Sequence, residues 1–433
     1  MLLQFSTADQ KRVIMGKKIG FVSTRFAGID GVSLEASKWA MVLEKDGHSC
    51  YWFAGELDQA PTNCLLVPEA HFQYDENNWI NEHIIGKKVR DISITDEIHS
   101  LRKVLKRKIY EYVRKFKIDL LIVENALSIP MNIPLGVALA EVISEMRIPT
   151  IAHHHDFWWE RTRYMINSCW DYIRMAFPPN LPNMKHVVIN SAAQEELALR
   201  TGISSTIIPN VLDFENPPSI NKERAKKWRA DIGLDDDDVL ILNPTRIIDR
   251  KGIELAIELV KELKDPRYKL VISHESGDEG FEYAKWLTSN ALIQGVDLRL
   301  CKAQIGDPLS SNANNQKGYS LWDIYPYADF ITYPSLYEGF GNALLESIYF
   351  KKPILINRYS TFIRDIEPKG FNFVVMDRFL TSKIVQRVRD ILESPERKKE
   401  MVDVNYNIAS RHYSFIELQK YLSGLMASFF GVD

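Results

Sequence analysis

Two glutamates, Glu338 and Glu346, stand eight positions apart in YPSLYEGFGNALLESIYF, which covers residues 333–350. A strand is predicted to end before the first glutamate, and a helix to begin just after Gly339 and Gly341. Glycines allow a ligand to approach the backbone closely, and the free N–H groups at a helix start bind anions. The carboxylates repel an anion and are better suited to accept hydrogen bonds from hydroxyl groups. A phosphate flanked by two hydroxyl-binding carboxylates describes a nucleotide sugar, with one sugar on each side of a diphosphate.

A second candidate segment, NPTRIIDRKG over Asn243–Gly252, carries the cations Arg246 and Lys251. It follows a predicted strand and opens a helix, and open α/β sheets bind their ligands beyond the carboxyl ends of strands. A planar guanidinium and a compact ammonium together suit two phosphate groups. Alone the segment is a weak signal, because basic loops are usually just solvated. Together with the two glutamates it favours a diphosphate site.

Three consecutive histidines, His153, His154 and His155, end the strand predicted in IAHHHDFWWERTRY, over residues 151–164. Neighbouring side chains of a strand point to opposite faces, so the three are not expected to share one metal ion. We therefore predict no metal site. A shift of one residue in register would exchange the faces, so the sequence does not decide which of the three faces a ligand.

An aromatic and basic cluster follows the histidines in the same segment. Aromatic rings stack on sugars, and arginines pair with carboxylates or phosphates, so the cluster is a candidate acceptor pocket. A packed loop without a binding role is the alternative interpretation. The members of the cluster are Trp158, Trp159, Arg161, Arg163 and Tyr164.

The elements that must position these residues alternate between strands rich in Ile, Val and Leu and amphipathic helices. A glycine-bearing loop, residues 24–31, lies between the first predicted strand and its helix, and strand–helix alternation recurs along the chain. Such alternation predicts parallel sheets covered by helices on both faces. A Pro- and Asn-rich stretch separates two series of this kind. We predict an α/β protein of two doubly wound, Rossmann-like domains, residues 1–212 and 213–413, with a cleft between them.

Two helices raise separate questions. The last predicted helix, residues 414–430, is apolar on more than one face, so residues 414–433 either pack back on the N-terminal domain or form an ordinary terminal helix. The helix over residues 98–117 carries many lysines and arginines beside an apolar stripe. Such a helix can lie on an anionic membrane, but packing of the stripe on the sheet with the cations in water is the favoured interpretation.

Composition excludes several classes of protein. The chain has 433 residues, of which 45% are hydrophobic and 26% charged, as in ordinary soluble domains. A net charge of −3 argues against nucleic acid as a partner. The four cysteines form no CxxC pair, which favours free thiols in a reducing compartment. No apolar run is long enough for a secretion signal or a membrane span, so we predict a cytoplasmic protein, without a prediction of its oligomeric state.

Together the motifs resemble those of the retaining GT-B glycosyltransferases, in particular glycosyltransferase family 4, also called group 1. The resemblance covers nearly the whole chain. It is strongest over Asn243–Gly252 and Ala328–Asn357, where the two glutamates have the spacing of the family. It implies that Glu338 contacts the hydroxyls of the donor sugar and that Glu346 holds those of the ribose.

The resemblance implies further roles. Arg246 and Lys251 match the pair that binds the diphosphate, and Gly31 matches a glycine that lets acceptor and phosphate approach the backbone. His155, placed by its position before Asp156, matches a histidine that faces the transferred sugar. Backbone N–H groups of the glycine turn are expected to meet the sugar and the phosphate. This turn comprises Gly339, Phe340, Gly341, Asn342 and Ala343.

The activity implied by the resemblance is transfer of a hexose with retention of anomeric configuration. The donor would be a nucleotide-diphosphate sugar of the UDP-glucose or GDP-mannose type, and the acceptor a hydroxyl of a small soluble sugar, sugar acid or sugar phosphate. A membrane-associated enzyme with a lipid-linked or polysaccharide acceptor is the alternative, followed by a non-catalytic nucleotide-sugar-binding regulator. Because two cations are available to balance the diphosphate, and no Asp-x-Asp pair stands at a predicted strand end, we expect no metal or other cofactor.

Overall fold

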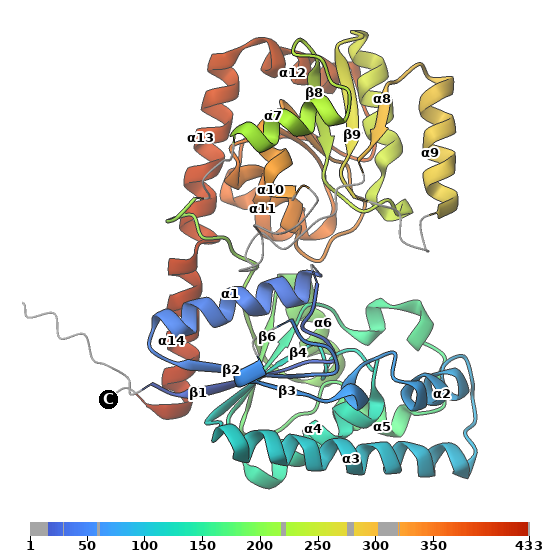
Figure 1. Cartoon of the computed structure of the whole chain (residues 1–433), viewed down its shortest axis with the longest axis vertical. Helices are drawn as coiled ribbons and strands as arrows, with labels where there is room; N and C mark the ends of the chain where they lie inside the picture. The colour runs from blue at the N-terminus through green and yellow to red at the C-terminus, as the bar shows by residue number, and fades with distance from the viewer. Residues whose placement is uncertain are drawn as a thin grey trace, which may run out of the picture. The chain divides into compact units, whose positions relative to one another are not determined.

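Strands and helices alternate around two separate parallel sheets (Figure 1). The structure, a computed structural model, describes residues 16–28, 30–58, 61–217, 222–274, 281–301, 319 and 321–431. Residues 1–15, which hold most of the segment examined for a secretion signal, lie outside this part. The predicted α/β class with two Rossmann-like sheets is confirmed.

The first sheet contains seven strands: β1 (Lys18–Val22), β2 (Ser49–Ala54), β3 (Cys64–Leu66), β4 (Leu120–Glu124), β5 (Thr150–His154), β6 (Met184–Val188) and β7 (Ser205–Ile207). Their order is β3-β2-β1-β4-β5-β6-β7, so the direction of winding reverses between β1 and β4. β1 pairs in parallel with β2 and β4, and β4 pairs in parallel with β5. Every residue of β4 and β5 is buried, as expected for strands covered on both faces.

Helices cover this sheet on both faces, with the first helix on one face and the long basic helix on the other (Figure 1). The helices are α1 (Gly31–Lys45), α2 (Asp75–Ile84), α3 (Ile92–Phe116), α4 (Ile133–Met146), α5 (Trp170–Ala176) and α6 (Ser191–Thr201). The basic helix, α3, begins at Ile92 rather than near Ile98, because the Asp91 side chain caps it by accepting a hydrogen bond from the Ser93 N–H at 2.9 Å.

The apolar stripe of α3 packs into the core. Its members Ile98, Leu101, Leu105, Ile109, Tyr112 and Phe116 are all buried. On the polar side, Arg102 and Lys106 both pair with Glu141 of α4. The stripe is therefore not available to a membrane surface, in line with the favoured interpretation. Among the residues that the structure describes, no helix is both long and apolar enough to cross a membrane.

The second sheet contains six strands: β8 (Val239–Asn243), β9 (Tyr268–Ile272), β10 (Leu298–Leu300), β11 (Phe330–Tyr333), β12 (Ile354–Asn357) and β13 (Val374–Met376). Their order is β10-β9-β8-β11-β12-β13, with a reversal between β8 and β11. The later helices are α7 (Lys222–Asp231), α8 (Ile253–Leu263), α9 (Phe281–Ile293), α10 (Leu321–Ile324), α11 (Asn342–Tyr349), α12 (Ser382–Glu393), α13 (Pro395–His412) and α14 (Phe415–Phe430).

The chain divides into two compact units at points that differ from the predicted boundaries. The first unit comprises Met1–Ala27, Ala36–Val187 and Leu418–Asp433, and the second Gly28–Glu35 and Val188–Glu417. The division falls at Val188 rather than at residue 212 because the intervening stretch bonds to later residues. Within the second unit, the Asn190 side chain donates to the Gly339 carbonyl at 2.7 Å, and the Leu212 N–H donates to the Tyr413 carbonyl at 2.9 Å.

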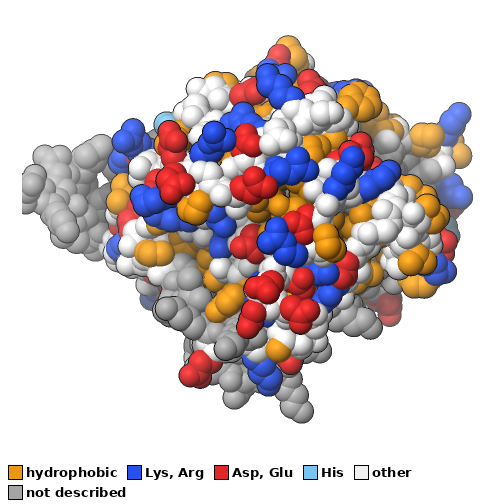
Figure 2. All heavy atoms as spheres, turned by 90° about the horizontal axis from the view of Figure 1, so that it is seen from above, with side chains coloured by type: hydrophobic (Ala, Val, Ile, Leu, Met, Phe, Trp, Pro, Cys, Tyr) orange, Lys and Arg blue, Asp and Glu red, His pale blue; other side chains and the backbone are white. Residues whose placement is uncertain are grey.

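Most of α14 belongs to the first unit. Leu418, Leu422, Leu425 and Met426 are buried, and the Gln419 side chain donates a hydrogen bond to Asp46 at the end of α1. The four cysteines are free and buried. On the face shown in Figure 2, lysines and arginines are interspersed with aspartates and glutamates, in line with the small net charge.

Candidate functional site

The reversal of strand order between β8 and β11 places the loops that follow these two strands side by side. Ligands of open α/β sheets bind at such a reversal. Arg246 and Lys251 follow β8, whereas Glu338 and the glycine turn follow β11. Lys251 and Glu338 are 87 residues apart in sequence, and the fold brings them into direct contact.

Lys251 and Glu338 form a buried ion pair. The Nζ atom of Lys251 donates a hydrogen bond to Oε1 of Glu338, and each side chain is 10% exposed. Burial alone would raise the pKa of the Glu338 carboxyl, but the Lys251 cation holds this pKa below its ordinary value. Burial lowers the pKa of Lys251, and Glu338 opposes this effect. Glu338 is therefore an ionised hydrogen-bond acceptor with a cation fixed at one of its oxygens.

The loop that carries Lys251 is held against the end of β11. Gly252 has a φ of +61°, and a Cβ at this position would lie 2.7 Å from the carbonyl oxygen of Pro334. Glycine is therefore required both for the left-handed backbone and for the close approach. The Leu336 N–H donates to the Arg250 carbonyl at 2.8 Å. These contacts fix the position of the Lys251 side chain relative to Glu338.

Arg250 belongs to this site although the sequence analysis gave it no role. Its Nη1 atom donates to the carbonyl oxygen of Tyr337 at 3.0 Å and lies 3.4 Å from Oε2 of Glu338. Both oxygens of Glu338 therefore face a cation. The available signal was the adjacent basic pair in DRKG, of which only Lys251 was assigned a role.

His274 is a second residue that sequence reasoning missed. It follows β9 directly, and its Nδ1 atom lies 2.9 Å from the hydroxyl oxygen of Ser273. Burial, together with the nearby charges of Arg246 and Lys251, lowers the pKa of His274 to about 4. The ring is therefore neutral at pH 7. Arg246, whose side chain is exposed, thus contributes to the shift of the His274 pKa.

The glycine turn after β11 is shaped by tyrosines beneath it. Gly341 has a φ of +119°, and a Cβ there would lie 2.9 Å from the hydroxyl oxygen of Tyr359 and 3.1 Å from that of Tyr333. The Tyr359 hydroxyl donates to the Phe340 carbonyl at 2.8 Å. α11 begins at Asn342 without a side-chain cap. The Leu344 and Leu345 N–H groups already donate to the Gly341 carbonyl, so an anion here would be bound by the N–H groups of Asn342 and Ala343.

Glu346 lies on α11, one turn from its start, and is only partly buried. Its Oε2 atom accepts a hydrogen bond from the hydroxyl of the fully buried Tyr325 at 2.9 Å. This bond orients one oxygen of the carboxylate. The two glutamates thus differ: Glu338 is buried and paired with a cation, whereas Glu346 is partly exposed and accepts a hydrogen bond from a phenol.

Gly31 is the first residue of α1, and a Cβ added to it would lie 3.5 Å from Nδ2 of Asn342. The preceding Asp30 caps this helix. Its Oδ1 atom accepts from the N–H groups of Val32 at 3.0 Å and Ser33 at 3.1 Å. A phosphate at the start of α1 would therefore compete with a carboxylate that is already present.

In the first sheet, Glu124 ends β4 at the corresponding reversal of strand order. Sheet register pairs Glu124 with His153, and His155 lies two residues further along the chain. Nδ1 of His153 lies 3.1 Å from Oε1 of Glu124, and Nε2 of His155 lies 3.0 Å from Oε2. These three groups offer donor atoms within 4.8 Å of one another, a spacing that a metal ion would also accept.

His154 points away from Glu124, as strand alternation predicts. Its Nε2 atom lies 2.9 Å from Nδ1 of His186 on the neighbouring strand β6. Burial lowers the pKa of His186 to about 4, and burial and the neighbouring histidines hold the pKa of His154 well below its ordinary value. This pair is therefore uncharged at pH 7 and fills the interior of the first unit.

The buried pair of His154 and His186 is expected to lower the unfolding free energy as pH drops from about 6.5 to about 4. In this window the unfolded chain binds more protons than the folded chain, because the folded pKa of His186 is the lower one. The full shift corresponds to about 3 kcal/mol. Urea denaturation at several pH values should show that the unfolding free energy of His186→Gln changes less with pH than that of the natural chain. The exposed His83→Gln is the control, and an unchanged pH dependence in His186→Gln would contradict the assignment.

The aromatic and basic cluster of residues 158–164 is bonded within the first unit. The Trp158 indole donates to the Phe177 carbonyl at 2.9 Å, and Arg161 pairs with Asp156. The Arg163 guanidinium lies 4.6 Å from the centre of the Tyr164 ring. These contacts describe a packed loop, and they leave the exposed Arg163 as its outward-facing cation.

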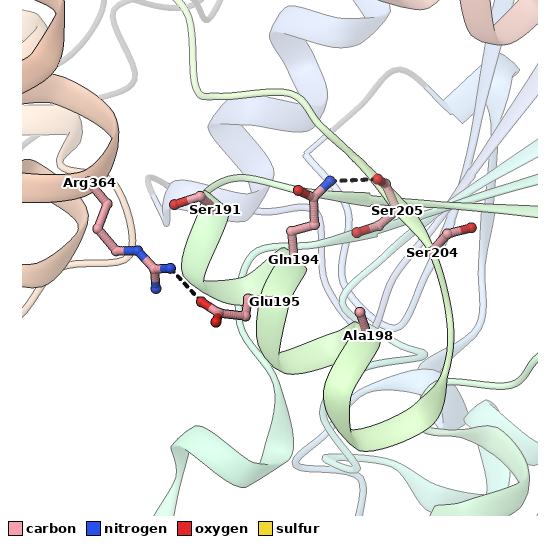
Figure 3. Close-up of a pocket in the computed structure, with 7 residues that line it drawn as sticks. All are labelled: Ser191, Gln194, Glu195, Ala198, Ser204, Ser205 and Arg364. Carbon is pink, nitrogen blue, oxygen red and sulfur yellow. Dashed lines mark hydrogen bonds and ion pairs between the residues drawn. The ribbon is translucent and has the colours of Figure 1, made fainter.

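A hollow of about 480 Å³ lies beside α6 (Figure 3). Arg364 reaches across it to pair with Glu195, and the Gln194 side chain donates to the Ser205 carbonyl at 2.7 Å. None of the site residues predicted from the sequence lines it. We assign no chemistry to this hollow.

Known proteins match the chain over nearly its full length. The family described as "Glycosyl transferases group 1" matches residues 312–407. The mannosylglucosylglycerate synthase of Thermotoga maritima is 31% identical over 94% of this chain and 99% of that protein. The protein of the same name from Petrotoga mobilis is 33% identical over 82% and 86% of the two chains. A solved glycosyltransferase from Rickettsia africae covers 96% of this chain and 100% of its own, with a TM-score of 0.68 at 12% identity, and shows likeness of fold.

Proposed function

Because the chain belongs to the group 1 glycosyltransferases of the GT-B fold, we propose that it transfers a mannosyl group from a nucleotide-diphosphate sugar to glucosylglycerate. The observation that carries this proposal is the 31% identity to a mannosylglucosylglycerate synthase over 99% of that relative. The name of that relative describes a product with a mannosyl unit on a glucosylglycerate. A single transfer that makes this product takes a glycoside of a sugar acid as acceptor, which falls within the small soluble acceptors expected from the sequence.

The residues after β8 and β11 support a nucleotide-sugar donor. Arg246 and Lys251 would hold the diphosphate, and the free N–H groups at the start of α11 would contact it as well. The ionised Glu338 would accept from hydroxyls of the transferred sugar, and Glu346 from those of the ribose. Burial of Glu338 strengthens such hydrogen bonds, because an accepting carboxylate is worth more in a dry site.

We propose retention of anomeric configuration by displacement on one face of the sugar. The bond between the anomeric carbon and the diphosphate oxygen breaks, and the acceptor oxygen bonds to the same face. The acceptor hydroxyl gives its proton to the departing diphosphate. Negative charge grows on that diphosphate, so Arg246 and Lys251 stabilise the transition state more than the ground state. We propose that these cations make a metal ion unnecessary.

A direct assay tests the proposed function. The purified protein is incubated with glucosylglycerate and either GDP-mannose or UDP-glucose. The product is identified by mass, and its anomeric configuration by the one-bond C–H coupling at the new anomeric carbon in the NMR spectrum. We expect mannosyl transfer, an α-linkage and the same rate in EDTA, with glycerate or glucose alone as poor acceptors. Inversion would overturn the mechanism, and loss of activity in EDTA that Mg²⁺ restores would overturn metal independence. If neither donor supports transfer, the proposed reaction is wrong.

A further inference from the structure

Glu124 is the most deeply buried charged group near the strand ends of the first unit, with 0% of its surface exposed. A carboxylate in such a place requires partners, because an isolated buried charge is strongly destabilising. The rings of His153 and His155 supply them. Nδ1 of His153 lies 3.1 Å from Oε1 and 3.0 Å from Oε2, and Nε2 of His155 lies 3.0 Å from Oε2. Burial would raise the pKa of Glu124, but the two histidines lower it to about 2, so it is an anion at pH 7.

The proton positions in this cluster follow from the charge of Glu124. An ionised carboxylate only accepts hydrogen bonds, so each ring nitrogen that faces it carries a proton. His155 is therefore protonated at Nε2, the atom 3.0 Å from Oε2. In the neutral ring the other nitrogen, Nδ1, is then a hydrogen-bond acceptor.

His155 is held by its backbone as well as by its ring. Its N–H donates to Oδ1 of Asn125 at 2.8 Å, and the Asn125 amide donates to Asp156 at 3.1 Å. The ring of His153 lies 4.3 Å from that of His155, so it supports the ring from one side. The two rings differ in access, since the His153 side chain is 1% exposed and that of His155 is 10% exposed.

We propose that Glu124 is a positioning residue that fixes His155 as its Nε2–H tautomer and so makes Nδ1 the nitrogen that accepts a hydrogen bond from a substrate hydroxyl. This inference rests on the proposed function, because that reaction supplies the substrate. Glu124 does not touch the substrate and acts only through the ring of His155. The same geometry explains why a glutamate occupies the last position of a strand whose other members are apolar.

The alternative occupant of this cluster is a metal ion, which the distances permit. A metal would bind through the same two ring nitrogens and would require both to be deprotonated. The tautomer of His155 therefore separates the two interpretations without any measurement of activity.

The first test is a ¹⁵N NMR spectrum of the ring nitrogens in protein labelled at histidine, with His155→Gln used to assign the signals. We expect Nε2 of His155 to have the shift of a protonated nitrogen and Nδ1 that of an acceptor, and metal analysis to find no bound ion. A protonated Nδ1 would overturn the proposal. So would a stoichiometric metal ion that His155→Gln removes. Because this spectrum is recorded without substrate, it remains decisive if the proposed reaction fails.

The second test compares Glu124→Gln, His155→Gln and the double variant in the transfer assay. We expect Glu124→Gln to lower kcat about tenfold, the loss of one hydrogen bond in the transition state, with little change in the KM for the donor. The double variant should be no slower than His155→Gln, because Glu124 acts through His155. Glu141→Gln, which removes another paired glutamate of the same unit, should keep full kcat. Losses that multiply in the double variant would overturn the proposal.

Discussion

Replacing Lys251 with alanine is expected to lower turnover by about two orders of magnitude and the unfolding free energy by about 3 kcal/mol. Lys251 and Glu338 are 8% and 7% exposed, so the substitution leaves a carboxylate buried without its closest cation. The loss of turnover has a separate cause, since charge that grows on the departing diphosphate loses a stabilising group. Steady-state kinetics and urea denaturation of the same preparation measure the two effects.

Two further variants separate these causes. Arg246 is exposed, so Arg246→Ala should lose a similar factor in turnover while its unfolding free energy stays within about 0.5 kcal/mol. The double variant Lys251→Ala/Glu338→Ala removes both buried charges and should regain part of the stability but none of the turnover. Near-normal turnover in both Lys251→Ala and Arg246→Ala would contradict the role given to the cations.

Replacing Gly341 with alanine is expected to reduce the unfolding free energy by about 3 kcal/mol and to weaken donor binding by more than about tenfold. A side chain at φ +119° is strained, and the new Cβ would press on the hydroxyls of Tyr359 and Tyr333. The Tyr359 hydroxyl supports the Phe340 carbonyl, so its displacement shifts the turn whose N–H groups face the phosphate.

Gly370→Ala is the matched control for this prediction. Gly370 also has a positive φ, +84°, but a Cβ there meets nothing within 4 Å. It should therefore lose only the cost of backbone strain, about 1 kcal/mol, and keep its KM for the donor. Equal losses in the two variants, measured by urea denaturation and donor titration, would show that strain alone accounts for the effect at Gly341.

The sequence predicted local features of the site well and its contacts poorly. Glycine turns, strand ends and helix starts are set by neighbouring residues, and Gly339, Gly341 and Asn342 fall where the pattern indicates. The contact between Lys251 and Glu338 depends instead on β8 lying beside β11, which is a property of the strand order. From the sequence, Lys251 and Glu338 are each expected to bind a different part of the donor, whereas in the structure they form an ion pair with each other.

The same difference between local features and contacts is found in the first sheet. Alternation along the strand correctly separates His154 from His153 and His155, since it depends only on the local backbone. Glu124, the partner of both outer histidines, lies on another strand. It stands near the end of the apolar run DLLIVEN, where the sequence pattern gives it no distinguishing feature. His274 escaped notice for a similar reason, because its neighbours Arg246 and Lys251 come from a different strand-end loop.

The first unit is built from segments far apart in the chain, which has a consequence during translation on the ribosome. Its core strand β1 and its last helical residues come from opposite ends of the described chain, and the 230 residues 188–417 lie between Val187 and Leu418. At about 5–20 residues per second a ribosome needs roughly 10–50 s to make that stretch. The surface that Leu418 and Leu422 cover stays open to water during this interval. The unit that is begun first is therefore completed last, and a nascent chain stalled in between exposes an apolar surface to chaperones.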